Sequence, residues 1–69
     1  MRISSRNQLK GTLKMIKKGP VNSEIIVSLS GGNEIVSVIT TYSAEKMELK
    51  EGSQVYVVVK ASEVMIGID

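Results

Sequence analysis

The stretch EIIVSLSGGNEIVSVIT, residues 24–40, decides the fold, because its pattern predicts two β-strands joined by a tight turn. The segments 24–30 and 34–40 are rich in Ile and Val, whose branched side chains favour extended backbone. Gly31, Gly32 and Asn33 between them tolerate the positive φ angles that hairpin turns require. We therefore predict that the two strands pair antiparallel.

The segment before this hairpin predicts one more strand and a loop. Residues 9–16, LKGTLKMI, alternate imperfectly between apolar and polar side chains, which is typical of a strand. Gly11 inside this strand indicates a bulge or a close approach of another backbone. Residues 17–23 collect charged residues with Gly, Pro and Asn, so we expect a loop there.

A short helix and two strands are expected after the hairpin. Ser43 is a candidate N-cap for a helix of one or two turns over residues 44–48. The segments 54–60 and 64–68 are predicted strands, with residues 61–63 as a tight link. Three strands, a short helix and two strands follow the element order of an all-β, five-stranded OB-like barrel.

The composition indicates one small domain that needs partners. A chain of 69 residues predicts a single domain, residues 1–69, with a marginal core. It contains no Cys and no His, so disulfides and ordinary metal sites lack their usual ligands. The predicted strand 54–60 is apolar on both faces, so we expect another subunit to cover one of them. These features favour a homo-oligomer.

Charge and residue usage exclude several classes of function. Without His and Cys the commonest general base and thiol nucleophile are missing, and no phosphate-binding loop is present, so an enzyme is not expected. The N-terminus lacks the apolar region of a signal peptide, and no apolar run approaches a membrane span, which favours the cytoplasm.

A nucleic-acid-binding module of the OB type is the alternative function. Single strands need aromatic faces for stacking and a positive groove. The chain has 2 Tyr, no Phe, no Trp and a net charge of only +2, which makes a poor platform. A purely structural oligomeric module is a third possibility.

The N-terminal stretch ISSRNQLKG, residues 3–11, concentrates hydrogen-bond donors. Arg supplies a fork of N–H groups, Ser supplies hydroxyls and Lys a point charge, so such a cluster can bind an anion. A fully deprotonated tetrahedral oxyanion accepts from all of them, whereas hydrogen phosphate carries a proton that needs an acceptor. Sulfate also passes this test. On composition alone, a solvated N-terminal arm is the favoured reading of the same residues, and Lys60 can simply reach water.

Three segments resemble the molbindins, small molybdate-binding proteins built from one Mop domain of the TOBE type. Residues 3–11 resemble the family's opening Ser-Ala-Arg-Asn-Gln-x-x-Gly. Residues 31–40, GGNEIVSVIT, followed by a short polar helix, resemble its middle segment, and residues 49–66, LKEGSQVYVVVKASEVMI, resemble its closing pattern. The similarity covers nearly the whole chain.

This resemblance implies an OB-like barrel that assembles as a hexamer, a trimer of dimers. It implies that the oligomer binds molybdate or tungstate at subunit interfaces and stores or buffers it in the cytoplasm. Molybdenum would then be held as the oxyanion and not as a free metal cation. The absence of a helix-turn-helix or an ATPase segment implies a stand-alone binder.

The resemblance also implies roles for the N-terminal residues. Ser4 would give its hydroxyl to the oxyanion, and Arg6 its guanidinium. Ser5 would offer its backbone N–H, with a dispensable side chain, because the family often has Ala there. Asn7 and Gln8 match the motif and would fix the backbone or an interface.

The remaining implied ligands come from later in the chain. Lys60 would supply its ammonium and Ala61 its backbone N–H. Thr40 matches a Ser or Thr that the family contributes from the neighbouring subunit. Ser62 receives no role, and the family's threefold-axis sites are not mapped onto residues.

Overall fold

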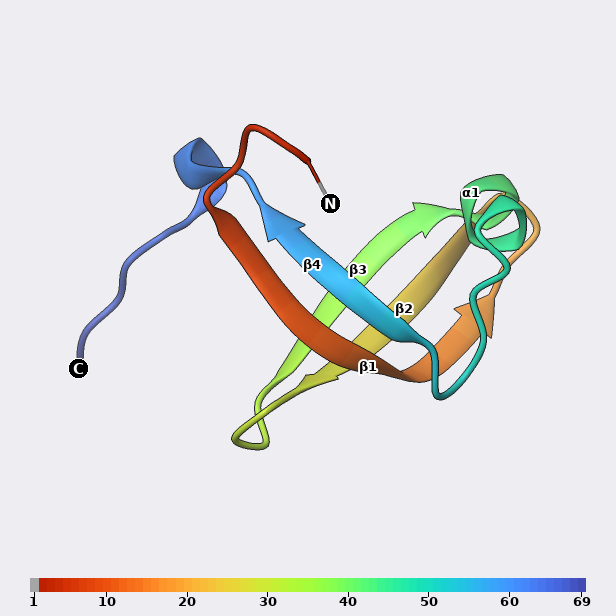
Figure 1. Ribbon diagram of the computed structural model, residues 1–69, viewed down its shortest axis with the longest axis horizontal. Helices are drawn as coiled ribbons and strands as arrows, with labels where there is room; N and C mark the ends of the chain where they lie inside the picture. The colour runs from red at the N-terminus through yellow and green to blue at the C-terminus, as the bar shows by residue number, and fades with distance from the viewer. Residues whose placement is uncertain (1) are drawn as a thin grey trace.

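Antiparallel pairing of neighbouring strands builds one curled sheet. The structure, a computed structural model, describes residues 2–69. Its elements in chain order are the strands and helices β1 (Asn7–Lys18), β2 (Asn22–Leu29), β3 (Glu34–Thr40), α1 (Thr41–Lys46), β4 (Gln54–Val59) and the 3-10 turn η1 (Ala61–Glu63). The strand order in the sheet is β3-β2-β1-β4, with β3 and β4 as its two edges (Figure 1).

The predicted hairpin is confirmed as β2 and β3. Ile26 lies opposite Val36 in this antiparallel pair. Gly31 and Gly32 in the turn have φ angles of 92° and 90°, which side chains with a Cβ rarely adopt. The turn is closed by the amide of Leu29, which donates to the carbonyl of Asn33 at 2.8 Å. The Ile- and Val-rich sequence and its glycine turn therefore specify this part of the sheet.

Strand β1 is the central element, because it pairs with both β2 and β4. Gly11 lies opposite Leu29 of β2 and opposite Val55 of β4. A Cβ at Gly11 would lie 2.4 Å from Cγ1 of Val27 and 2.9 Å from the carbonyl oxygen of Ser28. The close approach predicted from this glycine is therefore confirmed. The register shift of the strand lies further along, between Leu13 and Met15.

We expect Gly11→Ala to destabilise the fold by about 1–3 kcal/mol, the usual penalty for forcing extra volume into a packed site. Denaturant unfolding monitored by circular dichroism measures this change. Lys17→Ala, at an exposed position of the same strand, is the control and should change stability by no more than about 0.5 kcal/mol. Equal stability of Gly11→Ala and the unmodified chain would contradict the close approach.

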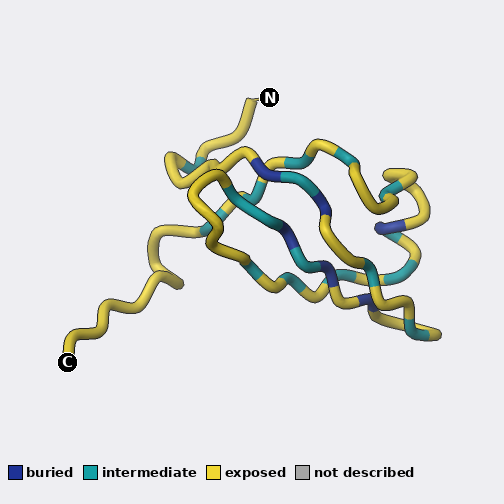
Figure 2. The backbone as a smooth tube through the Cα atoms, turned by 90° about the horizontal axis from the view of Figure 1, so that it is seen from below, coloured by how far each residue is buried: buried dark blue, intermediate teal, exposed yellow. Residues whose placement is uncertain are grey.

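The core is small and lies on the concave side of the sheet. Leu13, Ile25 and Val27 are its buried centre, with exposed fractions of 0%, 4% and 3%. Most of the buried positions lie in the strands, with Ala44 on α1 as an exception, whereas the C-terminal segment is exposed throughout (Figure 2). A core this small supports little stability by itself.

Helix α1 begins earlier than the sequence predicted. Its N-cap is Thr40 and not Ser43: the hydroxyl oxygen of Thr40 accepts a hydrogen bond from the amide of Ser43 at 3.1 Å. Thr40 ends β3 in an extended conformation, which is the backbone geometry that an N-cap needs. Ala44 is the buried residue of this helix. No helix within residues 2–69 is long and apolar enough to cross a membrane.

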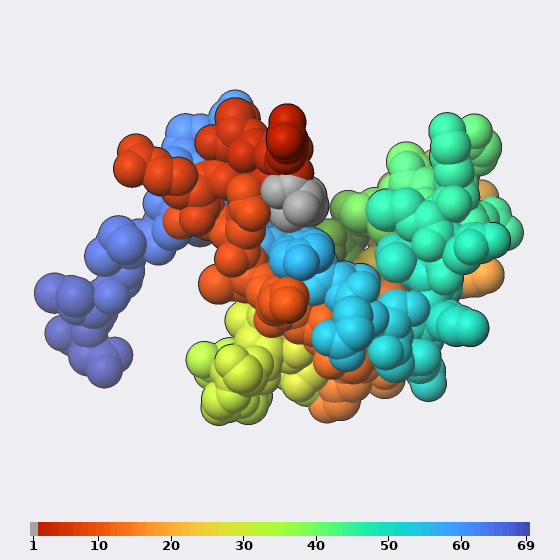
Figure 3. Space-filling view, in the orientation of Figure 1, coloured from red at the N-terminus to blue at the C-terminus, as the bar shows by residue number. Residues whose placement is uncertain are grey.

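The expectation of a fifth strand over residues 64–68 is wrong for the single chain. These residues follow η1 and pair with no strand of the described chain, so the sheet has four strands. Met65, Ile66 and Ile68 are 91%, 89% and 96% exposed. Figures 1 and 3 show this C-terminal segment projecting away from the body of the molecule. The apolar pattern alone cannot make a strand, because a strand needs a hydrogen-bonding neighbour.

The fold class predicted from the sequence is otherwise confirmed. The chain forms a curled antiparallel sheet with a short helix between the third and fourth strands, as in OB-like barrels. The two edge strands leave the curl open. An apolar groove, defined below, occupies this opening.

Candidate anion-binding site

A cavity lies where the N-terminal arm, residues 2–6, meets the end of β4. It has a volume of about 610 Å³ and is lined by Ile3, Ser4, Ser5, Arg6, Val58, Lys60, Ala61 and Ser62. Antiparallel pairing explains this meeting, because Asn7 at the start of β1 lies opposite Val59 at the end of β4. The residues that precede β1 and those that follow β4 are therefore held side by side.

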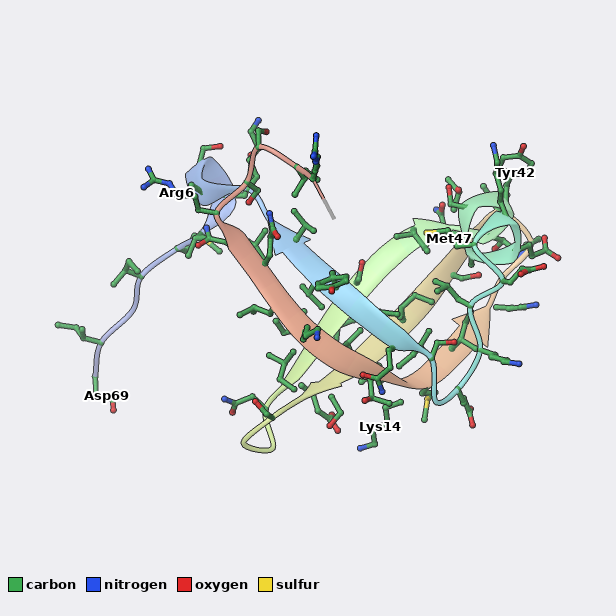
Figure 4. All side chains as sticks on the ribbon, in the orientation of Figure 1. Arg6, Lys14, Tyr42, Met47 and Asp69 are labelled. Carbon is green, nitrogen blue, oxygen red and sulfur yellow. The ribbon has the colours of Figure 1, made fainter. Side chains whose placement is uncertain are left out.

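Most of the candidate residues come together in this cavity. Ser4, Ser5 and Arg6 line it from the N-terminal arm, and Lys60 and Ala61 line it from the end of β4. Figure 4 shows Arg6 at the start of β1, with its side chain projecting outward beside the turn that follows β4. The two segments are far apart in the sequence but adjacent in the fold.

The hydroxyl of Ser5 fastens the arm to the sheet. It donates to the carbonyl of Val59 at 2.9 Å and accepts from the amide of Asn7 at 3.2 Å. The side-chain amide of Gln8 donates to the carbonyl of Ser5 at 2.6 Å. The side chain of Ser5 is therefore part of the local structure. The resemblance, in contrast, implied a dispensable side chain. Gln8 fixes the backbone, as expected from the motif.

The chemistry of the lining is that of an anion site. The cavity is lined by the cations Arg6 and Lys60 together with serine hydroxyls, and its lining contains no Asp or Glu. The amides of Glu63 and Val64 make the hydrogen bonds of η1. The amides of Ala61 and Ser62 open this turn, so its own bonds leave them available to a ligand. Charged and backbone donors of this kind bind carboxylates, phosphates and other oxyanions strongly.

Thr40 lies elsewhere in the same chain. It pairs with Asn22 at the opposite end of the sheet from the cavity and caps α1. The whole of β1, 12 residues long, runs between the two places. A single chain therefore does not bring Thr40 to the cavity, and only a neighbouring copy can do so.

Sequence reasoning gave no role to Ser62, Ile3 and Val58, although all three line the cavity. Ser62 brings a further hydroxyl beside Lys60 and Ala61. The available signal was its place directly after the Lys-Ala pair, where the chain turns. Ile3 and Val58 supply apolar walls, and an alternating strand pattern gives no sign that such residues border a site.

The cavity is too large for a small anion to be enclosed by one chain. Volumes of about 300–1,000 Å³ are typical of sites for drug-sized ligands. A tetrahedral oxyanion has only five heavy atoms, so it does not fill a cavity of about 610 Å³. A second wall is needed to remove the ion from water.

Comparison with known proteins places the chain in a family. The TOBE domain family matches residues 3–66. Molybdenum-pterin-binding protein 2 of Clostridium pasteurianum is 47% identical over 66 residues, covering 96% of this chain and 97% of the relative. The probable molybdenum-pterin-binding protein of Haemophilus influenzae is 36% identical over 69 residues, the full length of both.

Solved structures agree with this placement. MopII from Clostridium pasteurianum, in an apo form, superposes with a TM-score of 0.93 at 45% identity, covering 97% of this chain and 100% of that one. A molybdate-binding protein from Sporomusa ovata gives a TM-score of 0.91 at 38% identity, covering 99% and 100%. The cytoplasmic molybdate-binding protein ModG, solved with molybdate bound, gives 0.94 at 42% identity, covering 100% of this chain and 49% of its own.

The resemblance to molbindins seen in the sequence is thereby confirmed over nearly the whole chain. Both the family match and the superpositions include the N-terminal arm, β4 and most of the C-terminal segment. The chain therefore belongs to the TOBE-domain family.

Proposed function

We propose that this protein binds molybdate or tungstate as the intact oxyanion and stores or buffers it in the cytoplasm. The observation that carries the proposal is a cavity that Arg6 and Lys60 both line and whose lining contains no Asp or Glu. The names of the relatives and of the solved structures, which include a molybdate-bound one, support the same ligand. The proposed ligands are Ser4, Ser5 through its amide, Arg6, Lys60 and Ala61, completed by Thr40 of a second copy. Binding without catalysis is the proposed activity of this single domain.

A lining of donors selects among tetrahedral anions. Molybdate and tungstate are fully deprotonated and accept hydrogen bonds at every oxygen. Hydrogen phosphate would bury its own O–H against Arg6 and Lys60, where the lining carries no carboxylate to accept it. An unpaired buried donor is costly, so phosphate is disfavoured.

The nucleic-acid alternative receives no support from the arrangement of the aromatic residues. Tyr42 lies on α1 and Tyr56 on β4. Each ring is approached by a lysine, Lys46 at 5.9 Å and Lys10 at 6.0 Å from the ring centroids. Stacking of successive bases needs neighbouring rings along one groove, and these two are on separate elements.

We propose further that the protein is a homo-oligomer in which each copy completes the anion site and fills the apolar groove of another copy. An apolar groove of about 440 Å³ lies between the free edges of the sheet, lined from β3 by residues including Ile39 and from β4 by Val55, Tyr56 and Val57. The exposed segment 64–68 has the length and apolar character of one strand. It projects away from β3 and β4 of its own chain (Figure 1).

The proposed occupant of the groove is the segment 64–68 of a second copy. Both edge strands offer unpaired backbone groups, which favours addition of a strand. The exchange would cover the apolar residues of both copies. The superposition with ModG includes the whole chain, the projecting segment included, at a TM-score of 0.94. A hexamer, as the resemblance implies, is the proposed assembly.

Thermal unfolding in the presence of molybdate tests the proposed function. An ion that binds only the folded assembly stabilises it by RT ln(1 + [L]/Kd), about 2.7 kcal/mol at a concentration of 100 Kd. We expect a clear rise of Tm with molybdate and with tungstate, and little change with phosphate at the same ionic strength. Equal shifts with all three anions would indicate a general salt effect and would contradict the proposal.

A further inference from the structure

Ser5 connects the two segments that carry the cations of the site. Its hydroxyl donates to the carbonyl of Val59, a residue 54 positions away, at 2.9 Å. This carbonyl belongs to the peptide bond that leads into Lys60. The hydrogen bond therefore fixes the orientation of the backbone from which the Lys60 side chain departs. The same hydroxyl accepts from the amide of Asn7, so it is held on both sides.

Gln8 fixes the backbone of the N-terminal segment, from which the Arg6 side chain departs. Its side-chain amide donates to the carbonyl of Ser5 at 2.6 Å. That carbonyl belongs to the peptide bond that leads into Arg6. Gln8 is itself paired in the sheet, opposite Val58 of β4. The backbone before Arg6 is therefore tied to the central part of the sheet.

We propose that Ser5 and Gln8 are positioning residues that set the separation of Arg6 and Lys60 before the anion arrives. The inference rests on the proposed oxyanion binding at this cavity. Arg6 and Lys60 are both exposed in the single chain, so packing does little to hold their side chains near one another. The hydrogen bonds that fix each adjoining peptide limit how far the two side chains can diverge. A site that is already arranged loses less freedom when the ligand binds.

This role differs from what the resemblance implied for Ser5. A family that often has Ala at this position does without the hydroxyl, and the implied contact is the backbone amide alone. In this chain the hydroxyl makes two hydrogen bonds and is half-buried. The positioning through Ser5 is therefore a property of this sequence, whereas Gln8 acts through a backbone carbonyl and does not need the Ser5 side chain.

Molybdate titration of single variants tests the positioning role. We expect Ser5→Ala and Gln8→Ala each to raise the Kd about 5- to 10-fold, the ratio that corresponds to one lost hydrogen bond. Ser5→Thr keeps the hydroxyl and should restore the Kd to within about 2-fold of the unmodified chain. Gln8 is exposed, so Gln8→Ala keeps the test valid if Ser5→Ala fails to fold.

The control variant loses one side-chain hydrogen bond far from the cavity. Ser53→Ala removes the acceptor of the Lys50 amide. Ser53 lines neither the cavity nor the apolar groove. We expect this variant to keep the Kd of the unmodified chain. Equal weakening by this control would assign the effect to general stability and would overturn the positioning role.

Salt dependence separates positioning from direct contact. Ser5→Ala and Gln8→Ala keep both cations, so the Kd should respond to added salt as in the unmodified chain. Arg6→Ala removes a charge and should reduce that response. A reduced response in the Ser5 and Gln8 variants, or an unchanged Kd in both, would overturn the inference. Failure of the unmodified chain to bind molybdate would overturn the proposed function, and this inference with it.

Discussion

Replacing Lys60 by Ala, or Arg6 by Ala, should raise the Kd for molybdate at least about 30-fold, equivalent to about 2 kcal/mol. Both cations line the same cavity, and its lining contains no carboxylate that would compete with the anion. Removing one cation leaves the desolvated anion with fewer charge-assisted hydrogen bonds, which are the strong ones. Isothermal titration with molybdate measures the change directly.

The fold should survive these two substitutions, because Arg6 and Lys60 are both exposed in the single chain. Circular dichroism checks this point. Lys14→Ala is the matched control: it removes a surface cation that pairs with Glu34, away from both the cavity and α1. We expect its Kd to equal that of the unmodified chain. Unchanged affinity in both Arg6→Ala and Lys60→Ala would disprove the site.

A chain that ends at Glu63 should lose its oligomeric state and much of its stability. The deletion removes the apolar residues Val64, Met65, Ile66 and Ile68, which are 48% to 96% exposed in the single chain and are proposed to fill the groove of a second copy. Burying such side chains contributes about 1.5–3 kcal/mol each. Sedimentation equilibrium and thermal unfolding measure the two effects.

The control for this deletion is a chain that lacks only Asp69, which keeps the apolar segment intact. It should sediment and melt as the unmodified chain does. If the chain ending at Glu63 keeps both the mass and the Tm of the full chain, the segment is not exchanged. A monomeric full chain would contradict the exchange equally clearly.

The elements that sequence reasoning predicted correctly are those specified by local chemistry. The hairpin of β2 and β3 depends on Ile- and Val-rich runs and on Gly31 and Gly32, which adopt positive φ angles. The crowding at Gly11 was predicted because a glycine inside a strand is otherwise unfavourable. In each case the signal lies in one short stretch of the sequence, although the atoms that crowd Gly11 belong to Val27 and Ser28 of β2.

The errors arose where the structure of a segment depends on residues outside that segment. Ser43 has the composition of an N-cap, but Thr40 takes this role, because the end of β3 places it in the extended conformation that a cap requires. Residues 64–68 have the composition of a strand, but no edge of their own sheet receives them. Composition records a preference for extended backbone and not the identity of the neighbour.

The candidate site also combines features that local chemistry predicts with features that depend on distant residues. The donor chemistry of Ser4, Arg6 and Lys60 can be read from the residues, and the resemblance grouped them. The hydrogen bond from Ser5 to Val59 could not be predicted, because the two residues are 54 positions apart and meet only through the pairing of β1 with β4. The place of Thr40 depends on a second copy, so it remains a prediction.

Isothermal titration of the purified protein with molybdate, with sulfate and phosphate titrated under the same conditions, shows whether the cavity binds this oxyanion. Oxyanion binding at this cavity predicts saturable heats with molybdate and much weaker heats with phosphate, because a lining of Arg6, Lys60 and serines offers no carboxylate to accept the proton of hydrogen phosphate. The absence of heat with molybdate, together with an unchanged Tm, would contradict it.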